Sequence, residues 1–167
     1  MKAFKRLLDF LQSLTEYALF FMIAAMVVIV FAQVIFRFVL RASLPWSEES
    51  SRYIMVWISM LGASIGLRRK AHIGVEALLL LFPEWLKKAT SVLTTLVASG
   101  FFAGMIYYGV KICGVVAAQE SPAMEISMVI PYSSLVAGGF LMLLYSLEAL
   151  AELTFAHSAA AAGGEQR

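Results

Sequence analysis

Residues Tyr17 to Phe36 form an apolar run of 20 residues in which Gln33 is the only amide or charged side chain. A helix of about 20 apolar residues is what the ~30 Å hydrocarbon core of a bilayer requires. The run is longer than the apolar part of a secretory signal, and Arg37 follows it without a small-residue cleavage pattern. We therefore expect a retained membrane-spanning helix over residues 16–38.

The composition of the whole chain agrees with this assignment. Of its 167 residues, 61% are hydrophobic and 14% are charged, whereas a soluble domain carries about 25% charged residues. Further apolar segments predict spans over 47–68, 89–112 and 131–151. The sequence thus predicts an all-α integral membrane protein with four transmembrane helices. They form one domain, residues 1–157, followed by a disordered tail, 158–167.

Two amphipathic segments are expected to form short interfacial helices that lie along the membrane surface. Residues 3–14 repeat leucine and phenylalanine at helical spacing, with charged residues between them. Residues 75–88 carry a similar apolar stripe, but Glu76, Pro83 and Glu84 would interrupt a membrane span there. Trp85 in that segment suits the headgroup region.

Lysine and arginine are distributed unevenly over the predicted loops. Nine of the 13 lie in the N-terminal segment, in the connection between the second and third spans, and at the C-terminus. The other four are Arg37, Arg41, Arg52 and Lys111. Because basic residues are retained on the cytoplasmic side, both termini are expected in the cytoplasm.

The second apolar run is too short to cross a membrane alone. Tyr53 to Leu67 gives 15 residues, or about 22 Å at 1.5 Å per residue. The span must therefore take in the preceding turn, with Ser47 as a candidate N-cap. That turn carries the charged residues Glu48, Glu49 and Arg52.

This charged turn, preceded by Trp46, admits two interpretations. In the first, it is a capped helix start in which Arg52 pairs internally with Glu48 or Glu49, at i+4 and i+3 spacing. In the second, these charges pack with Arg37 against a partner, because the short apolar run draws them toward the membrane, where charges usually mark function. The residues alone leave both open.

Two glycine motifs and one histidine complete the candidate positions. Gly62-x-x-x-Gly66 and Gly100-x-x-x-Gly104 permit close approach of helices, and we expect them to serve packing within the chain. His72 is expected to be an interfacial residue. A haem site would need axial ligands that face each other from helix interiors, and the other histidine lies near the C-terminus.

Several classes of function find no support in the residues. The net charge of +2 and the single cysteine, Cys113, argue against nucleic-acid binding, a disulfide and a cysteine-ligated metal. No nucleophile-plus-base set or phosphate-binding loop is recognisable, so we expect no catalytic residue, no cofactor and no metal. The first, third and fourth spans also lack central ionisable residues, which a transporter acting alone normally carries.

The sequence resembles the small membrane subunit, the DctQ-type component, of tripartite ATP-independent periplasmic (TRAP) transporters. The likeness covers roughly residues 15–150 and is most specific from Pro45 to His72. It implies subunit-interface or structural roles for a set of residues within that region: Gln33, Arg37, Trp46, Glu48, Glu49, Arg52, Trp57, Gly62 and His72.

The resemblance implies a small, non-catalytic permease subunit of a sodium-driven, binding-protein-dependent transporter of organic acids in the bacterial inner membrane. Its partners would be a large multi-helix membrane subunit, which it scaffolds, an extracytoplasmic solute-binding protein and membrane lipid. Other classes remain open: a stand-alone small multidrug-type transporter, a structural subunit of another membrane complex, or a tetraspan membrane enzyme. A small multidrug-type transporter would require a carboxylate in the middle of the first span, but residues 23–30 of this chain are apolar.

Overall fold

The computed structural model describes residues 2–69 and 83–164, which form four α-helices. These are α1 (Lys2–Phe38), α2 (Pro45–Arg68), α4 (Glu84–Val116) and α5 (Val129–Gly164). Within these ranges there is no β-strand, and one isolated bridge pairs Glu120 with Ser127 in the loop between α4 and α5. The predicted all-α class is confirmed.

Three of the helices are long and apolar enough to cross a membrane. The segments concerned are Phe4–Phe38 in α1, Leu86–Val116 in α4 and Val129–Leu153 in α5. The 24 residues of α2 would extend about 36 Å, but charges at both ends leave it only a short apolar stretch. The fourth span therefore stays a prediction.

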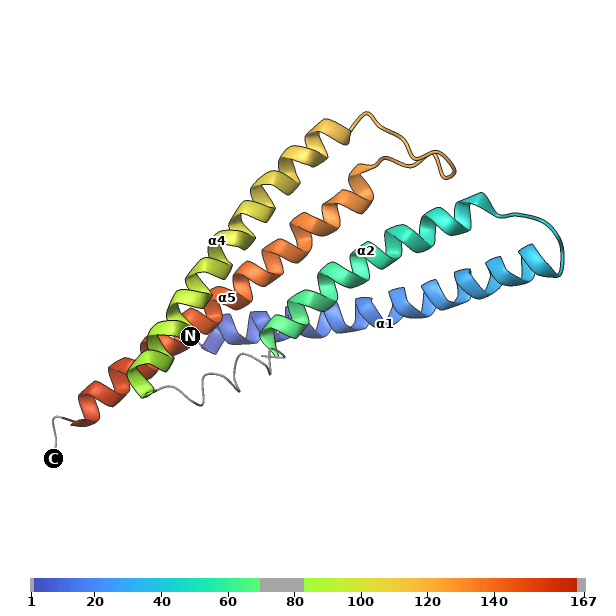
Figure 1. Cartoon of the computed structure of the whole chain (residues 1–167). Helices are drawn as coiled ribbons and strands as arrows, with labels where there is room; N and C mark the ends of the chain where they lie inside the picture. The colour runs from blue at the N-terminus through green and yellow to red at the C-terminus, as the bar shows by residue number, and fades with distance from the viewer. Residues whose placement is uncertain (1, 70–82, 165–167) are drawn as a thin grey trace.

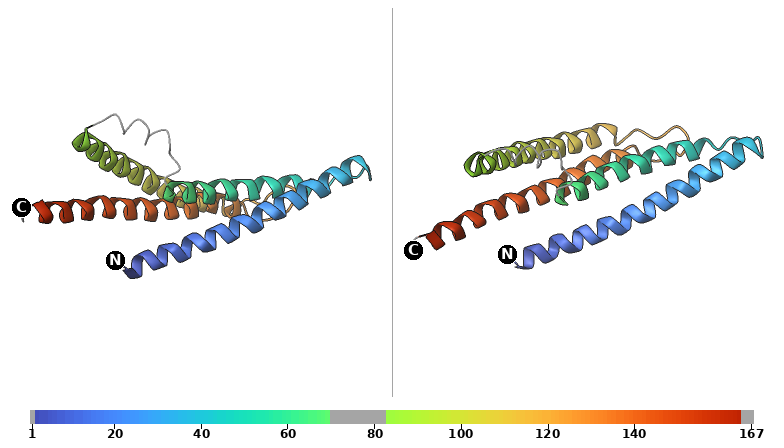
Figure 2. Two further views of the ribbon diagram at one scale, coloured as in Figure 1. Left: turned by 90° about the horizontal axis from the view of Figure 1, so that it is seen from below. Right: turned by 60° about the horizontal axis from the view of Figure 1, so that its bottom comes forward.

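The helices form an open, elongated array instead of a closed bundle. α2 packs between α1 and α5, and α4 packs on the other side of α5. α1 and α4 accordingly lie at opposite edges of the array (Figures 1 and 2). The loops 39–44 and 117–128 lie together at one end of the molecule, which we call the loop end (Figure 1). The N-terminus and the end of α5 lie at the other.

The contact between α2 and α5 depends on small residues. A Cβ placed on Gly138 of α5 would lie 2.8 Å from Met60 Cβ and 3.1 Å from the Met60 carbonyl oxygen, so glycine permits this close approach. Ser64 and Ser134 are fully buried, and each hydroxyl donates to a carbonyl of its own helix. Their polar groups are thus satisfied locally, which leaves the helices free to pack closely.

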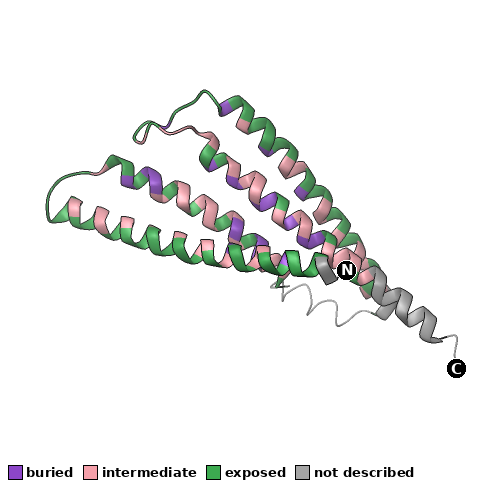
Figure 3. Cartoon of the chain, turned by 180° about the vertical axis from the view of Figure 1, so that it is seen from behind, coloured by how far each residue is buried: buried purple, intermediate pink, exposed green. Residues whose placement is uncertain are grey.

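Burial is concentrated in the middle of the array. Figure 3 shows most buried residues on α2 and α5, whereas α1 is exposed along most of its length. The exposed side chains of α1 are largely apolar and include Phe20, Phe21 and Phe31, each about two-thirds exposed. Such surface is suited to contact with lipid chains or with another membrane subunit.

The helix ends differ from the predicted ones at several points. α1 is continuous from Lys2, so residues 3–14 are the first turns of a long helix; their position at the membrane surface stays a prediction. α4 begins at Glu84, inside the segment expected to be interfacial, and the remainder of that segment up to residue 82 lies outside the described residues. α5 continues to Gly164, into the expected disordered tail, where alanine favours helix.

Candidate functional site

The charged turn of α2 begins with Pro45, whose fixed φ and missing N–H suit the first helical position. Leu44 precedes it and makes no side-chain cap. The predicted N-cap role of Ser47 is therefore wrong. Ser47 is buried inside the first turn, and its hydroxyl donates to the Leu44 carbonyl at 2.7 Å. The earlier start places Glu48 in the first turn, where the helix dipole favours a carboxylate.

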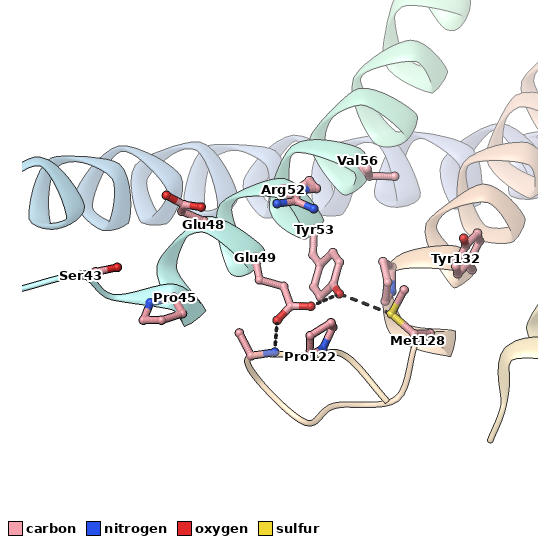
Figure 4. A pocket seen from close by; sticks show the side chains of 12 residues that line it. Ser43, Pro45, Glu48, Glu49, Arg52, Tyr53, Val56, Pro122, Met128 and Tyr132 are labelled. Carbon is pink, nitrogen blue, oxygen red and sulfur yellow. Dashed lines mark hydrogen bonds between the residues drawn. The ribbon is translucent and has the colours of Figure 1, made fainter. Parts of the chain in front are cut away.

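Glu49 ties α2 to the loop 117–128. Its carboxylate accepts hydrogen bonds from the backbone N–H groups of Ala123 and Met124, at 2.9 and 3.1 Å, and from the Tyr53 hydroxyl (Figure 4). That hydroxyl also lies 3.4 Å from the Met128 sulfur. Both carboxylate oxygens are thus occupied, and the side chain is buried between the helix and the loop.

Two further hydrogen bonds join α2 to its neighbours near the loop end. Gln33 on α1 donates from Nε2 to Glu48 Oε1 at 3.1 Å. Trp57 donates from Nε1 to the carbonyl oxygen of Ile130, in the first turn of α5, at 3.1 Å. The first four turns of α2 therefore hold α1, the loop 117–128 and α5 in one arrangement.

The two arginines of the predicted cluster are placed differently. Arg37, in the last turn of α1, and Arg52 are both exposed, and neither forms an ion pair with any residue in the described ranges. The internal pairing of Arg52 with Glu48 or Glu49 is therefore not present. Arg52 instead lines a cavity of about 650 Å³ at the loop end (Figure 4).

The glycine motifs do not pack within the described part of the chain, contrary to our expectation. A Cβ on Gly62, Gly66, Gly100 or Gly104 would meet no atom within 4 Å. Gly62 and Gly66 belong to a series of α2 residues spaced three or four apart, and such residues share one side of the helix. We call this series the open face of α2; it comprises Glu48, Arg52, Met55, Ser59, Gly62 and Gly66, all exposed or half-buried.

The open face thus brings together three of the predicted interface residues, Glu48, Arg52 and Gly62. Trp46, at the start of α2, is 45% exposed and lies outside this series. His72 lies outside the described residues.

A second polar cluster, at the end opposite the loops, was not singled out from the sequence. Arg68 donates from Nε to Glu148 Oε2 at 2.9 Å and from Nη2 to Asp9 Oδ1 at 2.6 Å. Its Nη1 donates to Gln12 Oε1 and to the Leu8 carbonyl, at 2.6 and 3.0 Å. Arg68 therefore joins α1, α2 and α5. One signal for it was available, since a carboxylate at position 148 in an otherwise apolar segment calls for a partner.

Comparisons with known proteins identify the same family that the sequence resembles. The family described as "Tripartite ATP-independent periplasmic transporters, DctQ component" matches residues 26–156. The chain is 34% identical over 85 residues to the C4-dicarboxylate TRAP transporter small permease protein DctQ of Vibrio cholerae, a match that covers 51% of this chain and 37% of that protein. It is 31% identical over 83 residues to the sialic acid TRAP transporter permease protein SiaT of Haemophilus influenzae, covering 50% and 14%. The chain thus spans well under two thirds of either relative.

Proposed function

The chain belongs to the family of DctQ components of tripartite ATP-independent periplasmic transporters, and on this basis we propose a specific role for it. It is the small, non-catalytic permease subunit that holds a large multi-helix permease subunit in position in the bacterial inner membrane. It scaffolds transport by that subunit and carries no solute by itself.

The open face of α2 is the observation that carries this proposal. α2 lies inside the array, between α1 and α5, yet a Cβ on Gly62 or Gly66 would meet none of the described residues within 4 Å. Glycines spaced in this way let the backbone of a second helix approach closely in a membrane. We propose that a helix of the large subunit packs along the part of the open face that runs from Met55 to Gly66.

The same packing supports four membrane spans. α2 lies along α1 and α5, both of which contain segments suited to crossing a membrane. A helix packed between two spans lies at the same depth, and its terminal charges then fall near the two membrane surfaces. The excess of basic residues at the opposite end from the loops supports cytoplasmic termini.

The remaining components are proposed from the relatives. Their names refer to C4-dicarboxylates and to sialic acid, which are organic acids that carry carboxylates. We propose that this chain serves a sodium-driven transporter of an organic acid, delivered by an extracytoplasmic solute-binding protein.

The assembly proposal is tested by enlarging one glycine on the open face. Gly62→Leu places a bulky side chain where the second helix would pack, whereas a Cβ at this position meets no atom within 4 Å among residues 2–69 and 83–164. Gly114→Leu is the matched control, since Gly114 on α4 is equally open. We expect Gly62→Leu to reduce the large subunit that co-purifies in mild detergent, with Gly114→Leu at the wild-type level. Wild-type recovery with Gly62→Leu would contradict the proposed interface.

A further inference from the structure

A cavity of about 650 Å³ opens beside the first turns of α2, and the scaffold role does not account for it (Figure 4). Its walls come from α2, from the loop 117–128 and from the first turn of α5. They combine an apolar lining, which includes Pro45, Val56, Met128 and Pro131, with three charged side chains, Glu48, Glu49 and Arg52. The volume lies in the range typical of small-molecule sites.

Two of these charged side chains, Glu48 and Arg52, are available to a ligand. Arg52 makes no ion pair with the residues of 2–69 or 83–164, so all its N–H donors can serve a ligand. Glu48 accepts one hydrogen bond, from Gln33, and retains acceptor capacity. Glu49 also lines the cavity, but its oxygens are occupied by Tyr53 and by the loop backbone. The cavity therefore offers one cation and one anion that this chain does not pair with each other.

The position of the cavity relative to the apolar part of α2 indicates the kind of ligand. Glu48 and Arg52 immediately precede the apolar stretch 53–67, so they mark the boundary between hydrocarbon and headgroups. The half-exposed Trp46 is of a type that favours this boundary. A ligand for this cavity would combine a charged headgroup with an apolar body, and phospholipids are the abundant molecules of this kind at that depth.

We propose that the cavity binds a zwitterionic phospholipid with a primary ammonium group, phosphatidylethanolamine. The Arg52 guanidinium donates paired N–H groups to the phosphate. The Glu48 carboxylate accepts an N–H from the ammonium, and the apolar walls cover the first part of the acyl chains. Phosphatidylglycerol lacks the ammonium and brings a net negative charge close to Glu48. Phosphatidylcholine carries no N–H to donate.

The test is lipid titration of the purified, delipidated full-length chain, with bound lipid counted by native mass spectrometry. We expect phosphatidylethanolamine to bind up to about fivefold more tightly than phosphatidylglycerol, because only its ammonium forms an ion pair with Glu48. Arg52→Gln should weaken phosphatidylethanolamine about tenfold or more, because charge-assisted hydrogen bonds are lost. The control is Arg37→Gln, which changes another exposed arginine near the loop end and should bind as the wild type does.

A second variant tests the ammonium contact, and unchanged circular dichroism shows that the variants are folded. Glu48→Gln should reduce the ratio of the affinity for phosphatidylethanolamine to the affinity for phosphatidylglycerol. Equal binding by wild type and Arg52→Gln would overturn the proposal, as would a wild-type preference for phosphatidylglycerol. It would also be overturned if Arg52→Gln released the large subunit while lipid binding stayed unchanged, since the cavity would then receive a protein side chain. The titration uses this chain alone, so its failure is distinguishable from failure of the assembly test.

Discussion

Arg68 on α2 and Glu148 on α5 form an ion pair in which both side chains are only 12% exposed. The same guanidinium reaches Asp9 on α1 and lies 5.1 Å from the ring centroid of Tyr145, a distance at which cation–π attraction operates. Because a buried charge is costly unless it is paired, this arginine holds three helices together. Glu49 does the same for α2 and the loop 117–128 at the other end.

Arg68→Ala is expected to destabilise the protein by about 3 kcal/mol or more, because it leaves Glu148 buried without its partner. Arg68→Lys should also destabilise it, since an ammonium cannot reproduce the planar fork that serves several acceptors. The free energy of unfolding would be measured in mixed micelles by denaturant titration, with helix content as the signal.

The adjacent arginine provides the control. Arg69 pairs with Glu16, but their side chains are 62% and 37% exposed, and exposed ion pairs contribute little. Arg69→Ala should therefore be close to wild type in unfolding free energy. Equal losses for the Arg68 and Arg69 variants would show that the cluster does not hold the helices together.

Glu49→Gln is expected to loosen the loop 117–128. Replacing the carboxylate weakens the acceptor for the Ala123 and Met124 amides, because hydrogen bonds to an ionised group are the stronger ones. Hydrogen exchange of those two amides should become faster. Glu48→Gln makes the same change one residue away, where the contact is to Gln33, and should leave both amides unchanged. Unaltered hydrogen exchange of both amides in the two variants would show that Glu49 does not anchor the loop.

The glycines of α2 and α5 should respond in opposite ways to an added methyl group. Gly138→Ala forces a Cβ against the Met60 backbone, and overpacking of this kind costs about 1–3 kcal/mol. The added methyl group of Gly62→Ala meets no atom within 4 Å in the described part of the chain, and alanine is favoured over glycine in a helix by up to about 1 kcal/mol. Thermal unfolding of the purified chain distinguishes the two; a stable Gly138→Ala variant would contradict the close contact.

The helices were largely predictable because long apolar runs mark them directly. The run that ends near Phe38 and the boundary at Arg68 follow from single stretches of sequence, and the charged turn from Trp46 to Arg52 carried the family resemblance. The ends of α4 and α5 were harder to place. Their terminal turns are amphipathic or alanine-rich, which suits a helix but does not require a membrane.

The partners of individual side chains could not be predicted from local patterns. Arg68 and Glu148 are 80 residues apart in the sequence, and nothing near either residue specifies the other. The motif Gly62-x-x-x-Gly66 shows that close approach is possible, but not which helix approaches. In the structure, Gly138 permits the close approach of α2 and α5, and a Cβ placed on its neighbour Gly139 would lie 2.9 Å from the end of the Met105 side chain.

Membrane orientation is expected to place both termini in the cytoplasm. Reporters that are active only in the cytoplasm should be active when fused after Arg167 and inactive when inserted in the loops 39–44 and 117–128. This follows from the distribution of basic residues and from an even number of spans. Activity in the loop 117–128 would contradict the four-span arrangement.

The central claim is that this chain supports transport by another subunit and transports nothing alone. Its most direct test is uptake of a labelled carboxylate solute into liposomes, with a sodium gradient and the solute-binding protein present. We expect background uptake with this chain alone, little with the large subunit alone, and sodium-dependent uptake that requires the binding protein when both are present. Sodium- or proton-driven uptake by this chain alone would contradict the claim and favour a stand-alone small transporter.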